Sequence, residues 1–455
     1  MKISKRILFY EITDDAILMV NTLTGAIDII NNELYNSLLN FNSSKQFQIE
    51  EATIDVLKRR GYLVNGSPSE KRKLHKITDA YARAEKRLRF VVCPTYSCNL
   101  RCTYCFEGDL PHDNDAFMDT GDVDRIFVAV DYLQQAFGRN RSSVELFGGE
   151  PLLPKTKNFV GAVFQEAARR SLPISIVTNG IHLDRFTDIL STYRELVYSV
   201  QITLDGPPAI HDKRRKFADN RGTFDRVILA IDNLLALQIK TVVRVNVDFQ
   251  NIDLVRELFV YIASKGWVAN PFFTSNIAPV QDHSFSKGYE FLLSEDVLVE
   301  KLFNIFKENQ EMADVFQLNM FRTLGHIQSV LKSGQMVQPF PYYCEANNLE
   351  FMVLGPDGYI YACTECMGSK EMAIGEFRPR PKLYEKAVNM WNGRNVFRMK
   401  KCRECDIALL CGGGCAYSAL TVNGDINEPV CNNARETIFA YLDYIRDELA
   451  DKASA

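Results

Sequence analysis

Three cysteines on one short segment are the residues of this chain best suited to metal chemistry. Cys98, Cys102 and Cys105 follow a C-x3-C-x2-C spacing within residues 94–107, PTYSCNLRCTYCFE. Three thiolates this close together can bind three irons of a cubane iron–sulfur cluster and leave the fourth iron open. A zinc site or a chance spacing is the other interpretation, because zinc also accepts cysteine ligands.

Eight further cysteines gather in the last quarter of the chain. The chain has twelve cysteines, and the 238 residues between Cys105 and Cys344 contain none. The eight are Cys344, Cys363, Cys366, Cys402, Cys405, Cys411, Cys415 and Cys431. Their spacings suit metal sites better than a disulfide framework, although a C-x2-C-x5-C-x3-C run can also bind zinc. The remaining cysteine, Cys93, closes a predicted strand and is expected to be a small buried hydrophobic residue.

Composition and charge narrow the class of protein. Hydrophobic residues make up 46% and charged residues 24% of the 455 residues, which is typical of globular domains, and the length suggests more than one domain. The net charge of −4 includes no strongly basic half, so no nucleic-acid partner is indicated. No apolar run approaches the roughly 18 residues of a membrane helix, and the N-terminus does not read as a signal peptide. We therefore expect a cytoplasmic protein that binds neither nucleic acid nor membrane.

Strands and helices alternate from Phe90 onward, and this alternation must position the first cysteine group. Six runs are predicted as strands, at residues 90–94, 144–151, 174–180, 200–206, 242–248 and 270–276. The helical stretches between them imply parallel strands joined by right-handed crossovers. Six such repeats, with polar residues at the carboxyl ends of the strands, indicate an α/β fold built on a partial barrel.

Polar motifs follow three of these strands. The second strand ends in GGEP (148–151), where the glycines allow close approach of the backbone to a ligand and the carboxylate of Glu150 can accept bonds from an ammonium group. The third strand ends in TNG (178–180), and the fourth ends in TLDG (203–206). A surface carboxylate at a turn is the alternative interpretation for Glu150.

Together these motifs resemble those of the radical S-adenosylmethionine (SAM) enzymes. The C-x3-C-x2-C loop, with Tyr104 before its last cysteine, is similar to the cluster loop of that family, and GGEP at 148–151 is similar to its GGEP motif. The segment from Thr203 to Arg215 resembles the SxDG…HDxxR segment of the family, with threonine in place of serine. The fold that the resemblance implies is a partial (β/α)6 TIM barrel.

The resemblance also implies a cofactor site. A [4Fe–4S] cluster on the three loop cysteines would bind the amino and carboxylate groups of SAM through its open iron, and an electron from the cluster would cleave SAM to a 5′-deoxyadenosyl radical. The residues that the resemblance places around SAM are Tyr104, Gly148, Gly149, Glu150, Pro151, Asn179, Thr203, Asp205 and Arg215. The choice between Arg214 and Arg215 stays open, and so does a structural pairing of Arg215 with Asp212.

The C-terminal cysteines resemble the SPASM domain, a cysteine-rich extension of radical SAM enzymes that modify peptides. The resemblance implies two auxiliary [4Fe–4S] clusters. The implied ligands are Cys402, Cys405, Cys411 and Cys431 for the outer cluster, and Cys344, Cys363 and Cys415 for the inner cluster. The inner cluster either takes Cys366 as its fourth ligand or keeps an open iron. We expect the open iron, which could bind a substrate thiolate.

The first 68 residues form a separate predicted module. Strand-like runs at 8–12, 17–21 and 26–30 precede two helical stretches. This order indicates a winged-helix-like module and resembles the precursor-peptide recognition domain of enzymes that modify ribosomal peptides, in which the leader peptide adds a strand to the sheet edge. A cap that only packs on the barrel is the alternative. The basic stretch that follows, 69–89, is predicted as a linker helix.

The complete arrangement resembles the sactipeptide and ranthipeptide maturases, and YIYACTECMG (359–368) resembles their Y-x-C-T-E-x-x-G stretch. We therefore predict an enzyme that abstracts hydrogen from a peptide carbon and joins that carbon to a cysteine sulfur as a thioether. The implied cofactors are three [4Fe–4S] clusters and SAM. The implied partners are a ribosomal precursor peptide bound through its leader and a one-electron reductant such as flavodoxin or ferredoxin.

Other functions remain as alternatives at this point. The same apparatus could form carbon–carbon crosslinks, or formylglycine as in sulfatase maturation, and a non-catalytic iron–sulfur protein is an alternative of another class. The predicted division of the chain is a recognition module at 1–68, a linker helix at 69–89, a radical SAM barrel at 90–280, bridging helices at 281–340, a SPASM domain at 341–440 and a C-terminal helix or tail at 441–455.

Overall fold

The computed structural model describes residues 1–41, 49–66, 72–73, 76–77, 79, 87–108, 116–333 and 340–454. The predicted linker helix at 69–89 therefore lies mostly outside the described residues. Within these ranges, no helix has both the length and the apolar character that crossing a membrane requires.

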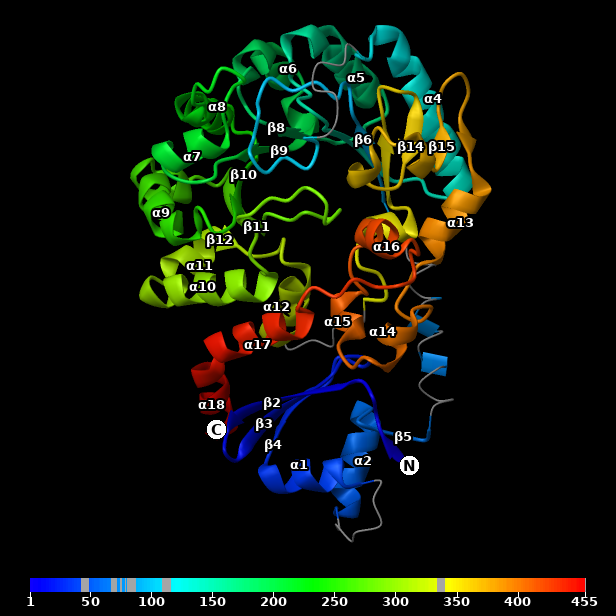
Figure 1. The fold of residues 1–455 in the computed structure, drawn as a ribbon, viewed down its shortest axis with the longest axis vertical. Helices are drawn as coiled ribbons and strands as arrows, with labels where there is room; N and C mark the ends of the chain where they lie inside the picture. The colour runs from blue at the N-terminus through cyan, green and yellow to red at the C-terminus, as the bar shows by residue number, and fades with distance from the viewer. Residues whose placement is uncertain are drawn as a thin grey trace.

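Six parallel strands in chain order form the centre of the molecule (Figure 1). They are β6 (Leu88–Val92), β7 (Ser142–Leu146), β8 (Ile174–Thr178), β9 (Val197–Thr203), β10 (Thr241–Val247) and β11 (Phe273–Pro279). Each strand pairs in parallel with the next, and the short β12 (Phe316–Gln317) extends the series beyond β11. The predicted alternation of parallel strands with helices is confirmed.

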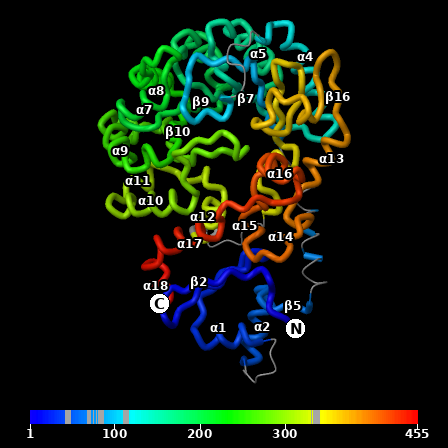
Figure 2. Tube along the Cα trace, in the orientation of Figure 1, coloured from blue at the N-terminus to red at the C-terminus, as the bar shows by residue number. Residues whose placement is uncertain are grey.

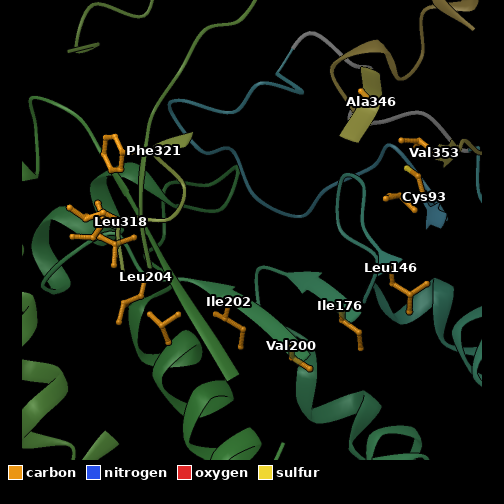
Figure 3. Packing of buried hydrophobic residues seen from close by; sticks show 14 of the residues in the cluster. Cys93, Leu146, Ile176, Val200, Ile202, Leu204, Leu318, Phe321, Ala346 and Val353 are labelled. Atoms are coloured by element: carbon orange, nitrogen blue, oxygen red, sulfur yellow. The ribbon is translucent and has the colours of Figure 1, made fainter. Parts of the chain in front are cut away.

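The helices between these strands cover the outer face of the sheet (Figure 1). They are α4 (Thr120–Phe137), α5 (Lys157–Arg169), α6 (Thr187–Thr192), α7 (Pro208–Arg214), α8 (Phe224–Ala236) and α9 (Val255–Ser264). Alternate strand residues such as Leu146, Ile176 and Val200 are at most 1% exposed and belong to the hydrophobic core (Figure 3). Burying each such side chain contributes about 1.5–3 kcal/mol. The residues between them point to the opposite side of the sheet, where polar groups such as Glu145 and Gln201 lie.

The chain returns to the first barrel strand after a set of bridging helices. These helices are α10 (Glu295–Glu308), α11 (Glu311–Val315) and α12 (Arg322–Ser333). Strand β13 (Phe351–Leu354) then pairs in parallel with β6, and β14 (Tyr359–Tyr361), β15 (Gly375–Glu376) and β16 (Lys382–Leu383) continue the sheet in antiparallel order. The cysteine-rich part therefore begins on the same sheet as the barrel, which the sequence did not indicate.

The rest of the cysteine-rich part is helical. Its helices are α13 (Glu385–Gly393), α14 (Lys400–Glu404), α15 (Ala408–Cys411), α16 (Ala416–Asn423), α17 (Ala434–Tyr444) and α18 (Arg446–Ser454). Figure 2 shows α14 and α15 between the barrel and the N-terminal segment.

The N-terminal residues form a small unit with its own core. Strands β2 (Ile7–Thr13), β3 (Ala16–Asn21) and β4 (Ile27–Ile30) make an antiparallel sheet, and the short strands β1 (Lys2–Ile3) and β5 (Leu63–Val64) pair separately. Helices α1 (Asn32–Leu39) and α2 (Glu51–Arg60) complete the unit. Its core includes Ile7, Ile17, Met19, Leu38, Leu57 and Tyr62. We call residues 2–64 the N-terminal module.

The N-terminal module is bonded to the cysteine-rich part. The guanidinium of Arg6 donates to the carbonyls of Cys402 (3.2 Å), Arg403 (2.7 Å) and Cys405. The hydroxyl of Thr22 donates to the carbonyl of Asp406 (2.5 Å). These bonds reach helix α14 and the turn after it, so the module contacts the cysteine-rich part and does not act only as a cap on the barrel.

Candidate active site and cysteine groups

The first cysteine group lies on the loop that follows β6. The N–H of Cys105 donates to the carbonyl of Cys102 (3.3 Å), so these two cysteines share one tight turn, and Cys98 precedes it. The N–H of Thr103 donates to the carbonyl of Arg214 (3.0 Å) and ties the loop to the end of α7. The three thiols are therefore held beside the carboxyl ends of the barrel strands.

Burial raises the pKa of each of these three thiols. The pKa of Cys105 rises to about 12, with the nearby carboxylate of Glu107 as the second cause. The pKa of Cys98 is raised by burial and then by Glu150, whereas Arg215 partly opposes the effect of burial on the pKa of Cys102. Thiolates at this site therefore need a strong cationic partner, and ligated iron is such a partner. The three cysteines therefore suit the binding of an iron–sulfur cluster.

Eleven of the twelve thiols of the chain form three groups in space, and Cys93 lies apart from them. All twelve cysteines are free. The negative charge of neighbouring thiolates contributes to the raised pKa of Cys98, Cys344, Cys363 and Cys402. The groups are Cys98, Cys102 and Cys105; Cys344, Cys363, Cys366 and Cys415; and Cys402, Cys405, Cys411 and Cys431. The structure thus brings together the members of each predicted ligand set, and it places Cys366, the possible fourth ligand of the inner set, beside Cys363.

The arrangement of ligands bears on the zinc interpretation. Among the described residues, no group of three or more His, Cys, Asp and Glu side chains could hold a single metal ion. A multi-iron cluster places each thiolate on a different iron, so its ligands lie further apart than the four ligands of one zinc ion.

The glycines of the CGGGC segment shape the third group. Gly412, Gly413 and Gly414 have φ values of 71°, 86° and 73°, a left-handed backbone that favours glycine. A Cβ on Gly412 would lie 2.3 Å from the carbonyl oxygen of Tyr342. The amides of Gly413 and Gly414 bond the sulfur of Cys411 and so oppose the rise in its pKa that burial causes. Amides of this kind stabilise thiolates and cluster sulfurs.

The GGEP turn packs directly on the first cysteine loop. The N–H of Glu150 donates to the carbonyl of Ser97 (3.0 Å). A Cβ on Gly148 would lie 2.4 Å from Sγ of Cys93, and one on Gly149 would lie 2.3 Å from the carbonyl oxygen of Ser97. The contact between turn and loop therefore explains both glycines, whereas the sequence suggested approach of a ligand. Cys93 is 0% exposed, as predicted for a buried hydrophobic residue.

Glu150 is 2% exposed and its carboxylate accepts three hydrogen bonds. The donors are the N–H of Leu152 (2.8 Å), the hydroxyl of Thr178 (2.6 Å) and the N–H of Asn179 (2.7 Å). Burial raises its pKa, and these three bonds oppose that rise. Since a carboxylate has about four acceptor positions, one position can still accept a bond from an ammonium group. The amide of Asn179 also reaches Sγ of Cys98 (3.8 Å).

The hydroxyl of Tyr104 is the centre of a polar network. It donates to the carboxylate of Asp205, and it accepts from Nη1 of Arg215 (2.8 Å) and from the amide of Asn246 (3.1 Å). Nε of Arg215 is buried and has no hydrogen-bond partner within the described part of the chain. A guanidinium with an unused donor beside the cysteine loop can bind a carboxylate.

Two neighbours of Arg215 have structural roles instead. Arg214 is 0% exposed, and its Nη1 donates to both carboxylate oxygens of Asp248 (2.6 Å each). Asp212 accepts two backbone N–H groups at the start of α8 (2.7 and 2.8 Å). Nε of Arg214 is also buried without a hydrogen-bond partner among the described residues. The two bonds to Asp248 fix the Arg214 guanidinium, however, so the geometry favours Arg215 as the arginine that could bind a carboxylate. Asp212 bonds the start of α8 and not Arg215.

The other predicted contacts have simpler surroundings. The carbonyl of Pro151 accepts a hydrogen bond from Thr156 (2.6 Å), which closes the turn after GGEP. Thr203 is the last residue of β9 and is 8% exposed, at the same sheet edge as the cysteine loop.

The sequence analysis missed the polar face of β10. Nε of Arg244 donates to the side chain of Asn246 (2.8 Å), and Asn246 in turn bonds Tyr104. Asp248, just after the strand, binds Arg214. The available signal was the R-x-N-x-D pattern at 244–248, because alternate strand residues face the same side.

Comparison with known sequences agrees with this geometry. The sequence model of the Radical SAM superfamily matches residues 92–262. The cysteine-type anaerobic sulfatase-maturating enzyme of Clostridium novyi (strain NT) is 26% identical over 72% of this chain and 88% of that protein. The GTP 3′,8-cyclase of Chlorobaculum tepidum is 32% identical, over 36% of this chain and 46% of that protein.

Solved structures share the fold. The structure of native anSMEcpe with bound AdoMet has a TM-score of 0.61 and 19% identity, and the match covers 81% of this chain and 99% of that chain. Streptococcus suis SuiB bound to precursor peptide SuiA has a TM-score of 0.55 and 16% identity over 94% of this chain and 98% of that chain. With the matched family and the shared α/β fold, residues 92–262 are a radical SAM domain.

Proposed function

We propose that this protein is a radical SAM enzyme that modifies a ribosomally made precursor peptide by joining a cysteine sulfur to a carbon atom as a thioether. The observation that carries the precursor-peptide part of this proposal is the N-terminal module, whereas the thioether part rests on the resemblance of residues 359–368 to the thioether-forming maturases. The match to SuiB covers 94% of this chain, and the 6% that it leaves out is shorter than the N-terminal module. Most of residues 2–64 must therefore lie within the match. The anSMEcpe match covers 81%, which leaves room for the module to be absent there.

The sheet of the module has an edge that suits a peptide strand. The strand order β2-β3-β4 makes β2 and β4 the edges, and Tyr10 of β2 already bonds Asp443 (2.6 Å) and Arg446 (3.0 Å) near the C-terminus. Strand β4 borders a cavity of about 820 Å³. Its lining includes Ile27, Asp28 and Ile29 of β4, Phe303 of α10 and Tyr441 of α17. An extended leader peptide could pair with β4 inside this cavity.

The cofactors follow from the three thiol groups. We propose one SAM-binding [4Fe–4S] cluster on Cys98, Cys102 and Cys105, and two auxiliary clusters on the C-terminal groups. When bound, the first cluster supplies the electron that cleaves SAM. The chain would hold the SAM amine at Glu150 and its carboxylate at Arg215, and this fixed geometry would place the reactive carbon beside the peptide.

Hydrogen bonds connect the cysteine loop to the segment that carries two thiols of the inner group. The hydroxyl of Tyr96, on the loop, donates to Asp357 (2.9 Å) and accepts from the N–H of Gly368 (3.1 Å). Both partners flank the segment that carries Cys363 and Cys366. A substrate peptide held near the loop would therefore lie close to the inner group, as electron transfer to an auxiliary cluster requires.

Iron content tests the cofactor assignment. After anaerobic reconstitution, the protein should contain about twelve irons, and a Cys98→Ala/Cys102→Ala/Cys105→Ala variant should contain about eight, because each cubane holds four. If the protein bound only four irons and the variant none, the auxiliary clusters would be excluded and the thioether mechanism with them.

Peptide mass spectrometry tests the reaction. The enzyme should be co-expressed with a candidate precursor, chosen as a small cysteine-containing reading frame found beside its gene, with the triple cysteine variant as control. We expect the loss of two hydrogens per crosslink, retention of sulfur and loss of thiol alkylation, all dependent on the three cysteines. A product without these changes would contradict thioether formation.

Sulfatase maturation is the second candidate function, favoured by the similarity to the Clostridium novyi enzyme. Its product from cysteine is formylglycine, which loses the sulfur atom. Sulfur content of the product therefore separates the two functions in the same experiment.

A further inference from the structure

Three C-x2-C pairs of the chain share one backbone geometry. In each pair, the N–H of the second cysteine donates to the carbonyl of the first. The distances are 3.3 Å for 102–105, 3.3 Å for 402–405 and 3.1 Å for 363–366. The first two pairs belong entirely to predicted ligand sets. Such a tight turn brings two sulfurs to the same side of the chain, which is why C-x2-C recurs in metal sites.

The side chain of Cys366 lies among other thiols. It is 0% exposed, and its thiol neighbours that of Cys363, whose pKa it raises. The Cys363 thiol in turn lies within electrostatic reach of Cys415, and Cys344 lies within reach of both. Cys366 therefore belongs to a group of four thiols that come from three separate segments of the chain.

Cys93 shows what a buried cysteine with a packing role looks like in this protein. It is also 0% exposed, but its thiol donates to the carbonyl of Thr95 (3.3 Å) and packs against Gly148. A packing role needs no thiol neighbours. The thiol surroundings of Cys366 therefore require a different explanation.

We propose that Cys366 binds the inner auxiliary cluster together with Cys344, Cys363 and Cys415 and completes its four ligands. This inference rests on the proposed function, because it requires the auxiliary clusters. It replaces the open iron that we expected from the sequence. That expectation arose because the 238 residues before Cys344 have no cysteine, whereas the fourth ligand lies after Cys363, within the same turn.

A complete ligand set changes what the inner cluster can do. No iron of that cluster would be free to bind a cysteine of the substrate peptide. The protein itself would then have to position the substrate sulfur, and the inner cluster would serve to pass electrons. The position of the turn fits this role, because Gly368 connects it to Tyr96 of the SAM-binding loop.

The experiment uses EPR of the reduced protein with cyanide, a small ligand that binds accessible cluster iron. The background is the full chain with Cys98→Ala/Cys102→Ala/Cys105→Ala, which removes the SAM-binding cluster. Cys366→Ala, Cys363→Ala and Cys93→Ala are each added to this background. We expect cyanide to leave the spectra of the background and of Cys93→Ala unchanged.

In Cys366→Ala and Cys363→Ala, we expect cyanide to change the spectrum of one cluster, or that cluster to be lost so that about eight irons fall to about four. A cyanide-dependent change in the background protein, where Cys366 is intact, would overturn the inference and leave the proposed function standing. If cyanide left the spectrum of Cys366→Ala unchanged and its iron content stayed at about eight, the inference would also be overturned and the proposed function would stand. A background protein without iron would instead overturn the proposed function and the inference together.

Discussion

At the scale of single residues, Glu150 shows how one carboxylate can hold the protein together and still bind a ligand. Two of its three hydrogen bonds join the GGEP turn to the end of β8, and the third, from Leu152, lies within the turn. Glu150→Gln keeps the shape and removes the charge. We expect it to weaken SAM binding roughly 10- to 100-fold, since a hydrogen bond to a charged group contributes about 1.5–3 kcal/mol. Titration of SAM into anaerobically reconstituted protein measures this change.

The matched control is Glu145→Gln. Glu145 lies on β7, shortly before the GGEP turn, and contacts Arg89 (3.4 Å), so it is not part of the proposed SAM site. SAM binding should be unchanged in this variant. Equal weakening in both variants would mean that Glu150 acts only through the stability of the barrel.

Arg394 is a buried cation without a carboxylate partner among the described residues. It is 0% exposed, and it donates to the carbonyls of Ile426 (2.6 Å) and Gly413 (2.7 Å). Burial lowers its pKa, whereas the nearby thiols of Cys344 and Cys415, followed by those of the outer group, raise it. An unpaired buried charge is costly. We infer that two anionic clusters balance the charge of Arg394.

This inference predicts a change in reduction potential. Arg394→Leu should make the auxiliary clusters harder to reduce by on the order of 50–100 mV, because a positive charge nearby favours the added electron. EPR-monitored redox titration measures the potential. Arg398→Leu, which removes an exposed arginine of the same segment, should leave it unchanged. An unaltered potential in Arg394→Leu would show that the guanidinium is only structural.

Adjacent arginines illustrate what the sequence could not decide. Arg214 is the last residue of α7, whereas Arg215 leaves the helix with φ −122° and ψ 95°. After that change of backbone direction, Arg214 bonds Asp248 and lies over the ring of Tyr104, whereas Arg215 bonds the hydroxyl of Tyr104. The motif could be recognised from the sequence, but the contacts depend on the exact end of a helix.

At the scale of elements, the positions of the barrel strands could be predicted from the sequence, whereas the pairing of strands far apart in the chain could not. The six barrel strands follow from local patterns of hydrophobic residues, and all six form. The pairing of β13 with β6 joins Phe351 to Arg89. No local pattern encodes a contact across that many residues, so the continuity of barrel and cysteine-rich part could not be predicted.

Strand β4 carries a prediction about peptide binding. Ile29 lies on β4 and lines the 820 Å³ cavity, so Ile29→Asp should place an unpaired charge where the leader peptide would pack. We expect leader affinity to fall at least about tenfold, which corresponds to about 1.4 kcal/mol. Fluorescence anisotropy of a labelled leader peptide measures the affinity.

Val56→Asp is the control for this prediction. Val56 lies on α2 of the same module, is 41% exposed and does not line the cavity. It should leave leader affinity unchanged. If both substitutions had the same effect, the peptide would bind elsewhere or the module would simply be destabilised.

At the scale of the whole molecule, the N-terminal module and the outer thiol group are physically joined. Arg6 is 5% exposed and bonds the carbonyls of Cys402, Arg403 and Cys405, which form the C-x2-C turn. Lys5, beside it, forms an exposed ion pair with Glu404. Exposed pairs contribute little to stability, whereas buried bonds to a charged group contribute more.

These bonds predict that the N-terminal module slows the loss of iron from the outer cluster. Arg6→Ala should release iron to a chelator several-fold faster than the unchanged protein, because the turn that holds Cys402 and Cys405 loses three hydrogen bonds. Lys5→Ala should release iron at the unchanged rate. A leader peptide that stabilises the module against this turn should slow iron release in the unchanged protein and slow it less in Arg6→Ala. Equal rates in all three proteins would mean that the module and the cluster are independent.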